Sequence, residues 1–419
     1  MSKIKISLFF VLIVLFSFSS LIIAQDLPEI TMWAKSGPEG TALEKAAAVY
    51  EENTGNSVKV EIMGRSGYRS KYRTVLMSGS SEVDGILDVA YTVPTLAAGG
   101  FLANMDEYVK NNEDYNYTQG LPEAVQEEMK FDGSWYMLPT DLSAESMVYR
   151  TDLFPHAPET WSELVEFAKE YTQKYNEDSP TKYGYAFCGA PNVIHGTWRS
   201  MRYAFGGRII NDEGEVMVDD PKTIESFEFL VDLKRKHEVT PPDVTSWDYP
   251  EVLTALQEGV VASASFFTAG MPILTDPDES PKVYDKIKFV AQPSGPAGAF
   301  TRINPLGVMV NASSERKEAT WEFLKWLTGP EGGELYTEFG GTNPRESIIM
   351  NEKWHESRPW YPDLYEAVQS GGVGSLNHAK SSQITDTFNK WAGRVLNGNM
   401  TTEEAFNECA EELRDLLDQ

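Results

Sequence analysis

The clearest pattern of apolar and polar positions in the chain lies between Ile30 and Met63. Apolar and polar residues alternate at both ends of this segment, as they do in β-strands. Between the two ends, Thr41 and Glu44 have the spacing of a capping box, apolar residues follow at helical spacing, and Gly55 ends the helix. Two strands about thirty residues apart and joined by a helix predict a right-handed crossover between parallel strands.

The same alternation of strands and helices continues through both halves of the chain. The predicted strands are 85–92, 183–188, 260–267, 287–290 and 306–310. Thr160 and Glu163 form a second capping-box pattern, which places Trp161 on the apolar face of a helix. Two further helices, 383–396 and 401–417, close the chain. This order predicts an α/β protein with mostly parallel sheets flanked by helices.

Aromatic rings and neutral polar groups follow several of these strands. The rings at strand ends or turns are Trp33, Tyr68, Tyr91, Trp198, Phe266 and Phe267. Open parallel sheets bind ligands beyond the carboxyl ends of their strands. A sugar presents C–H groups on one face and hydroxyls around its edge, so flat rings with Asp, Asn and Arg complement it. The pattern favours a sugar site, and local packing of each ring is the alternative.

The length and the N-terminus indicate a secreted protein with more than one domain. The chain has 419 residues, which predicts two or three units, and we expect two lobes. Residues 1–24 combine a basic start, an apolar run and a final Ala24, a pattern typical of a secretory signal peptide cleaved after Ala24. The alternative is an uncleaved anchor helix of about 18 residues.

The charge and the cysteines narrow the partners and the location. A formal net charge of −27 disfavours nucleic acid and anionic lipid, because both bind basic surfaces. The two cysteines, Cys188 and Cys409, are far from Ala24, so neither can be a lipid-modified anchor. We therefore expect a soluble periplasmic protein in which both thiols are core residues rather than a disulfide.

Known catalytic and metal-binding patterns are missing from the sequence. The five histidines are scattered, and there is no HExxH, GxSxG, Walker loop or CxxC pair. A retaining glycosidase needs only two carboxylates about 5 Å apart, and 63 acidic residues leave room for such a pair. A phosphate ligand would need clustered basic residues at strand ends, where the candidates are Lys35, Arg65 and Arg302.

Six stretches of the chain resemble those of one protein family in their order and spacing. They read ITMWAKSGPEGTALEKAAAVYEENTG, LDVAYTVPTLAAGGFLANMDEYV, DGSWYMLPTDLSAESMVYRTDLF, APETWSELVEFAKEY, FGGRIINDEGEVMVDDPKTIESFEFLVDL and KEATWEFLKWLTGPEGGELYTEFGGTNPRES. The match extends over nearly all of the chain after the signal peptide. In these stretches the chain resembles the extracellular solute-binding proteins of ATP-binding-cassette importers, the sugar-binding family that includes maltose-binding protein.

The resemblance implies a two-lobed periplasmic-binding-protein fold with the ligand cleft between the lobes. The first lobe would contain residues 25–140 and 308–350, and the second lobe residues 141–307 and 351–419. The implied ligand contacts are Trp33, Ser36, Arg65, Tyr68, Tyr91, Thr92, Asp141, Trp198, Phe267, Gly270, Arg302 and Asn304. Trp33 is expected to stack on the sugar because it ends the first strand. Phe266 and Phe267 stand where relatives often have a tryptophan.

The implied function is that of a non-enzymatic receptor. Such a protein captures a mono- or oligosaccharide in the periplasm and delivers it to the permease subunits of an importer, as a monomer and without a cofactor or metal. Two alternatives stay open at this point. One is a receptor of the same fold for a polyol, a glycerol phosphate or a peptide, and the other is a secreted glycan hydrolase.

Overall fold

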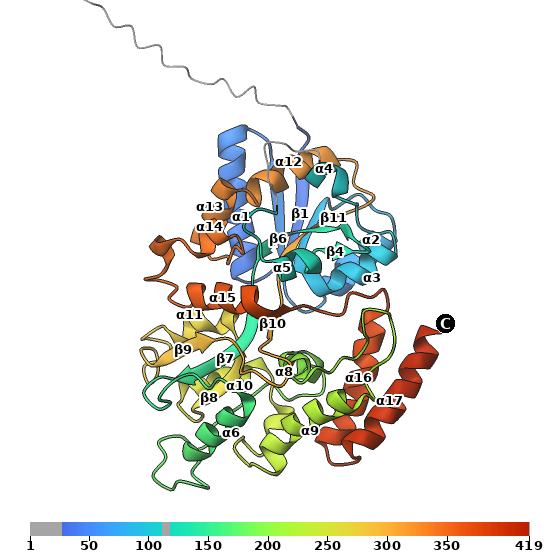
Figure 1. The fold of residues 1–419 in the computed structure, drawn as a ribbon. Helices are drawn as coiled ribbons and strands as arrows, with labels where there is room; N and C mark the ends of the chain where they lie inside the picture. Colours follow the sequence, from blue (N-terminus) through green and yellow to red (C-terminus); the bar gives the residue numbers. More distant parts are fainter. Residues whose placement is uncertain (1–26, 111–117, 419) are drawn as a thin grey trace, which may run out of the picture.

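A computed structural model describes residues 27–110 and 118–418 of the chain. The expected signal peptide, residues 1–24, lies outside the described residues. The chain forms two lobes, each built on a β-sheet flanked by helices (Figure 1). The expected two-lobed α/β fold is therefore confirmed. Among the described residues, none of the helices has the length and apolar character needed to cross a membrane.

The first lobe contains a five-stranded sheet in the order β2-β1-β3-β11-β6. Its strands are β1 (Ile30–Lys35), β2 (Val58–Met63), β3 (Gly85–Val89), β11 (Leu306–Val310) and β6 (Met137–Asp141). β1 is parallel to β2 and β3, as the crossover predicts, whereas β11 is antiparallel to β3 and β6. A strand from late in the chain therefore completes the sheet of the first lobe.

The helices of the first lobe cover both faces of this sheet. They are α1 (Pro38–Thr54), α2 (Tyr68–Met77), α3 (Val93–Ala98), α4 (Asp106–Lys110), α5 (Glu123–Glu128), α12 (Lys317–Leu327) and α13 (Pro330–Glu338). A hairpin of β4 (Lys130–Phe131) and β5 (Ser134–Trp135) precedes β6.

Helix α1 begins earlier than its sequence pattern predicts. Pro38 occupies the first turn after Gly37, so Thr41 lies inside the helix and does not cap it. Proline suits this position because the first helical N–H groups have no partner within the helix. The expected end is confirmed, since Gly55 adopts a left-handed conformation with φ 77° and donates to Glu51 O.

The second lobe contains a sheet in the order β12-β10-β7-β8, with β9 also paired to β7. Its strands are β7 (Ala144–Arg150), β8 (Ser263–Phe267), β9 (Ile287–Val290), β10 (Thr301–Ile303) and β12 (Gly372–Val373). Among these strands, β10 and β12 pair in parallel, whereas β7 is antiparallel to β8, β9 and β10. The prediction of mostly parallel sheets is wrong for this lobe, because β7 leaves the first lobe and β10 returns towards it. Residues 183–188 form isolated bridges rather than the predicted strand.

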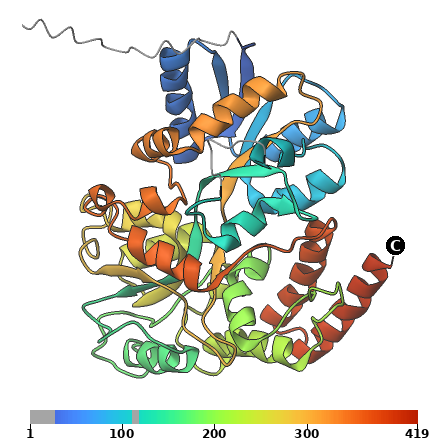
Figure 2. The same cartoon turned by 45° about the horizontal axis from the view of Figure 1, so that its top comes forward.

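Helices cover the second sheet and extend well beyond it. They are α6 (Trp161–Glu170), α7 (Ile194–Thr197), α8 (Arg199–Phe205), α9 (Pro221–Arg235), α10 (Tyr249–Gln257), α11 (Met271–Leu274), α15 (Tyr361–Gly371), α16 (Ser381–Leu396) and α17 (Thr402–Leu417). Helix α14 (Glu346–Ile349) contacts α13 of the first lobe and α15 of the second. Figure 2 shows α16 and α17, in red, at the side of the lobe next to α9.

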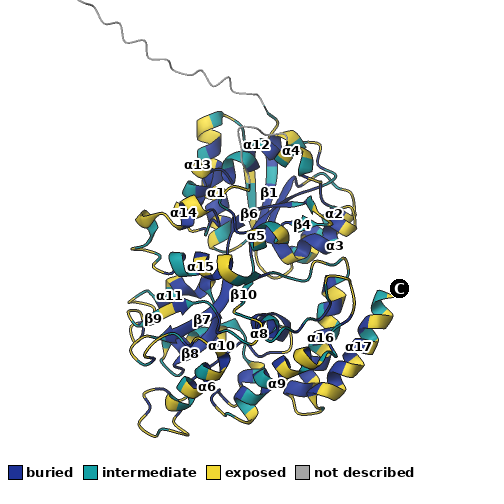
Figure 3. Ribbon diagram, viewed as in Figure 1, coloured by how far each residue is buried: buried dark blue, intermediate teal, exposed yellow. Residues whose placement is uncertain are grey.

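Each lobe has its own buried core (Figure 3). The core of the second lobe includes Trp161, which is 3 % exposed as predicted. Thr160 accepts a hydrogen bond from Glu163 N, but the Glu163 carboxylate accepts from Glu159 N, so the capping is shifted by one residue. Both cysteines are free and buried, as expected.

Two neighbouring strand connections join the lobes. β6 leads into β7 through Leu142 and Ser143, and β10 leads into β11 through Asn304 and Pro305. Asn304 N donates to Ser143 O at 2.7 Å, so the two connections are hydrogen-bonded at the crossing. Leu142 N also donates to Thr342 O at 2.7 Å, which attaches a third passage of the chain. The exact lobe boundaries given by the resemblance stay a prediction.

Candidate functional site

A cavity of about 470 Å³ lies where the two lobes meet. It is lined by Arg73, Tyr91, Cys188, Asn192, Val193, His195, Gly196, Thr197, Arg199, Asp248, Phe267, Arg302, Ser375, Leu376, Ser381, Ser382, Thr385 and Asp386. Both lobes contribute, because α2 and the turn after β3 provide Arg73 and Tyr91 and the remaining residues belong to the second lobe.

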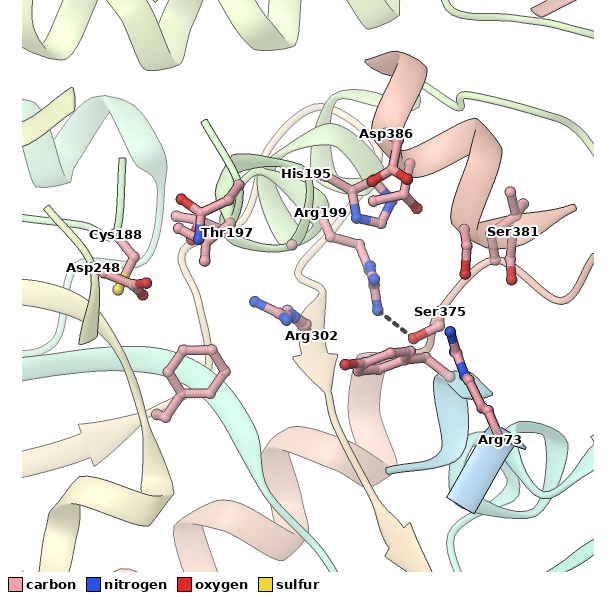
Figure 4. A pocket seen from close by; sticks show the side chains of 18 residues that line it. Arg73, Cys188, His195, Thr197, Arg199, Asp248, Arg302, Ser375, Ser381 and Asp386 are labelled. Carbon is pink, nitrogen blue, oxygen red and sulfur yellow. Dashed lines mark hydrogen bonds between the residues drawn. The ribbon is translucent and has the colours of Figure 1, made fainter. Parts of the chain in front are cut away.

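The second lobe presents its residues at the ends of short elements. Phe267 is the last residue of β8, and Arg302 is the middle residue of β10. His195 and Thr197 lie in α7, and Arg199 begins α8. Figure 4 shows the side chains of His195, Arg199 and Arg302, with Ser375 and Arg73, around a shared space.

Two aromatic rings give the cavity apolar surface. Tyr91 is 38 % exposed, which is unusual for a large ring in this protein, and the guanidinium of Arg69 lies 5.2 Å from the centre of the ring. Phe267 is partly exposed, and the guanidinium of Arg302 lies 5.0 Å from its ring. Rings held in this way can pack against the C–H face of a ligand.

Charged and polar groups surround these rings. Arg302 forms a 2.6 Å ion pair with Glu145, which faces it directly across the pairing of β10 and β7. Arg199 donates to the hydroxyl of Ser375 at 3.3 Å. The backbone N–H of Ser375 donates to the carboxyl of Glu128 at 2.7 Å, which fixes the loop that follows β12.

Burial and the arginines that lie close together here lower the pKa values of Arg199 and His195. Burial, followed by the charge of Arg302, lowers the pKa of Arg199 to about 9, so its guanidinium is still charged at neutral pH. Burial and the charges of Arg199, Arg202 and Arg302 lower the pKa of His195 well below its ordinary value. The His195 ring is therefore neutral at pH 7 and can offer both a donor and an acceptor.

Three of the residues named from the sequence line this cavity. They are Tyr91, Phe267 and Arg302. Tyr91 follows β3, Phe267 ends β8 and Arg302 lies in β10. The ends of these strands face the other lobe, where the rule for ligand sites in α/β sheets predicts a site.

Trp33 and Trp198 are placed differently from the expectation that they contact a ligand. Trp33 is 3 % exposed and belongs to the core of the first lobe, where Lys71 of α2 lies 4.4 Å from its ring. β1 continues to Lys35, so Trp33 lies within the strand and under α2 rather than at the strand end. Trp198 is fully buried, stacks on Phe388 at 5.0 Å, and donates to Ser226 through its indole N–H.

The other residues named from the sequence lie outside the cavity lining. Tyr68 is buried, and its hydroxyl lies 2.9 Å from Trp33 O and 3.0 Å from Leu87 O. Thr92 and Gly270 are also buried, the hydroxyl of Thr92 donating to Val89 O. The remaining four residues, which lie at the lobe surface or the crossing, are Ser36, Arg65, Asp141 and Asn304.

The basic residues expected at strand ends also differ from those found. Lys35 lies near the carboxylates of Glu39 and Asp88, and the side chain of Arg65 is 64 % exposed beside Glu39. The cavity is lined instead by Arg73 and Arg199, which both lie on helices. Sequence reasoning missed them because it examined only strand ends for basic groups.

The described residues contain no cluster of three or more His, Cys, Asp or Glu side chains that could hold a metal ion. What the cavity offers instead is two rings, several hydroxyls and three arginines. This arrangement can bind a polar organic solute by ring contacts and hydrogen bonds.

Comparison with known proteins agrees with this description. Residues 34–334 match the model of a family described as "Bacterial extracellular solute-binding protein". The chain belongs to this family. Its fold is that of substrate-binding proteins of importers, and the family implies a small-molecule ligand, an importer as partner and a location outside the cytoplasmic membrane.

Several similar proteins are named for the ligands that they bind. The chain is 25 % identical over 292 residues to a maltotriose-binding protein of Pyrococcus abyssi, which covers 65 % of this chain and 57 % of that protein. It is 23 % identical over 313 residues to an arabinooligosaccharide-binding protein of Halalkalibacterium halodurans, and this match covers 69 % of this chain and 67 % of that protein. The solved structure of maltose-bound MalE3 of T. maritima has a TM-score of 0.78 at 24 % identity, covering 93 % of this chain and 99 % of that chain.

The buried positions of Trp33 and Trp198 predict a separation of stability from binding. Trp33→Ala and Trp198→Ala should each lower the free energy of unfolding by about 3 to 5 kcal/mol, because each leaves a cavity in a core. Tyr91→Ala should leave stability nearly unchanged but weaken ligand binding roughly 30- to 1,000-fold. Urea unfolding without ligand and calorimetric titration with ligand measure the two effects. If Trp33→Ala had normal stability but did not bind ligand, Trp33 would be a ligand contact and not only a core residue.

Asp141 predicts a dependence of stability on pH. It accepts from Thr342 N at 2.8 Å and from the hydroxyl of Tyr336, but burial raises its pKa to about 6. The folded state therefore binds more protons than the unfolded state between about pH 4 and pH 6, and stability contributed by protonated Asp141 is lost as pH rises through this window. Across this pH window, the free energy of unfolding of the wild type should fall by about 3 kcal/mol relative to that of Asp141→Asn.

Urea unfolding at pH 4, 5, 6 and 7 measures this difference. Asp285→Asn is the control, because Asp285 is exposed. A difference between wild type and Asp141→Asn that is the same at all four pH values would contradict the raised pKa.

Proposed function

We propose that the protein binds a sugar, a mono- or oligosaccharide, between its lobes and delivers it to the permease of an ATP-binding-cassette importer. The observation that carries this proposal is the cavity at the lobe junction, where Tyr91 and Phe267 combine with hydroxyl and charged side chains. Its volume of about 470 Å³ is within the usual range for small-molecule sites.

The composition of the cavity supports a sugar over an apolar ligand. Hydroxyls of Thr197, Ser375, Ser381 and Thr385 line it together with the two rings. Sugar hydroxyls need donors and acceptors at many positions, whereas the C–H faces of sugar rings pack on aromatic side chains. The similar proteins that are named for binding maltotriose and arabinooligosaccharide also support a sugar ligand.

The connection of the lobes supports capture by closure. Residues of both lobes line the cavity, and the chain passes between the lobes at the crossing strands. A ligand that contacts both lobes stabilises the arrangement in which they lie close together. A permease can then recognise the closed form, which exists mainly when solute is bound.

Sugar binding is tested by thermal unfolding with a panel of neutral, acidic and amino sugars. A ligand at a hundred times its dissociation constant should stabilise the folded protein by about 2.7 kcal/mol. The sugar should be recovered unchanged after prolonged incubation, as judged by chromatography. Turnover that follows the protein through purification would support the glycan-hydrolase alternative instead.

Export is tested on the N-terminus. We propose that residues 1–24 are removed in the periplasm and that the mature protein carries no lipid anchor. The mature protein should then begin at Gln25 and appear in the osmotic-shock fraction, with both Cys188 and Cys409 retained. N-terminal sequencing measures this, and an intact chain in the membrane fraction would contradict it.

A further inference from the structure

The three arginines of the cavity differ in how they are paired. Arg302 has a carboxylate partner, Glu145, at 2.6 Å, yet its Nε is buried without an acceptor. Arg199 is 4 % exposed, and the hydrogen bond found for it among the described residues goes to the neutral hydroxyl of Ser375. Arg73 has a buried Nε without an acceptor. The cavity therefore contains more donors than the protein itself satisfies.

Two partly exposed arginines of the first lobe have carboxylate partners, whereas the buried Arg202 has none among the described residues. Arg69 is 2.8 Å from the carboxylate of Asp88, and Arg316 is 3.0 Å from that of Asp84. A buried charge without a partner costs several kcal/mol, so proteins usually provide one. The position of Arg199 at a cavity wall suggests that its partner comes with the ligand.

Acidic groups near the cavity do not compensate Arg199. Asp248 caps α10 by accepting from Tyr249 N at 2.8 Å, and Asp386 is exposed on α16. Figure 4 shows these two aspartates on opposite sides of the space around the arginines. The Glu128 carboxyl accepts from the backbone N–H of Ser375, and desolvation raises its pKa. The lining residues therefore include three arginines against two aspartates, although the whole chain has a net charge of −27.

A further unsatisfied donor lies on the same wall. The hydroxyl of Thr197 is buried without a hydrogen-bond partner, and Thr197 is 7 % exposed. Gly196, the residue before it, leaves room for Arg302, because a Cβ at this position would lie 2.4 Å from the guanidinium carbon. The absence of a side chain at residue 196 allows the guanidinium of Arg302 to lie flat against α7.

We propose that the solute of this cavity carries an anionic oxygen group, as in a sugar acid, and that Arg199, Arg73 and Arg302 bind it. This inference rests on the proposed sugar-binding function and narrows it to acidic sugars. A carboxylate accepts two parallel hydrogen bonds from a guanidinium, and a phosphate group has the same chemistry. The rings of Tyr91 and Phe267 then contact the sugar, while the hydroxyl of Thr197 donates to the anionic group or to a neighbouring hydroxyl.

The test compares sugars that differ only in charge. D-glucose, D-glucuronate and D-glucose 6-phosphate form one set, and D-galactose, D-galacturonate and D-galactose 6-phosphate form a second. Calorimetric titration of the full mature protein should give at least roughly 30-fold tighter binding of an acid than of its neutral sugar, the value expected for a buried charged hydrogen bond. Tighter binding of a 6-phosphate supports the anionic group and assigns it to phosphate.

A matched pair of variants locates the anion. Arg199 and Arg202 both lie on α8, are 4 % and 5 % exposed, and have no carboxylate partner among the described residues, but only Arg199 lines the cavity. Arg199→Met should abolish the preference for the acid, whereas Arg202→Met should retain it. Without ligand, Arg199→Met should unfold at a urea concentration no lower than the wild type does, because it removes an unpaired buried charge.

The remaining outcomes also decide the question. A neutral sugar that binds as tightly as its acid overturns the inference, as does a preference that survives in Arg199→Met. If no sugar binds, the proposed function fails, and sodium acetate and sodium phosphate then test the anion site alone. A rise in melting temperature in wild type, absent in Arg199→Met, supports the inference in that case, and no rise in either protein rejects it.

Discussion

The pairing of strands on both sides of the lobe junction determines where everything else in this protein lies. β6 and β11 are neighbours in the first sheet, and their continuations, β7 and β10, are neighbours in the second. Because the backbone N–H and C=O groups of a buried strand need partners, the two connections must stay together as they cross. The register of β7 and β10 places Arg302 opposite Glu145, which fixes one side of the cavity.

This constraint also explains which parts of the fold could be predicted from sequence. The first crossover was predicted well because a strand, a helix and a strand follow one another and each has its own period. The antiparallel pairings of β7 could not be read in this way, since they join residues more than a hundred positions apart, such as Glu145 and Phe267. A residue two positions from a strand end can also be covered by a helix, as Trp33 is by α2.

The site was predicted only in outline. Tyr91 and Phe267 follow the rule for strand ends, Arg302 lies within β10, and all three line the cavity. Arg199 and Ser375 could not be associated from the sequence, because 176 positions separate them. The net charge did not predict the basic residues of the cavity either, since the chain has 63 acidic residues and yet three arginines line this one cavity. Net charge describes the long-range field of a protein, whereas a binding site depends on which few groups the fold brings together.

The two buried thiols have a practical consequence. Burial raises the pKa of Cys409 to about 12 and also raises that of Cys188. Maleimide dyes react with thiolates, so neither native cysteine is a good target in the folded protein. Ser382 is exposed at the rim of the cavity. A cysteine introduced there could carry a single environment-sensitive fluorophore without removal of the native thiols, which would turn the protein into an optical sensor for its own solute.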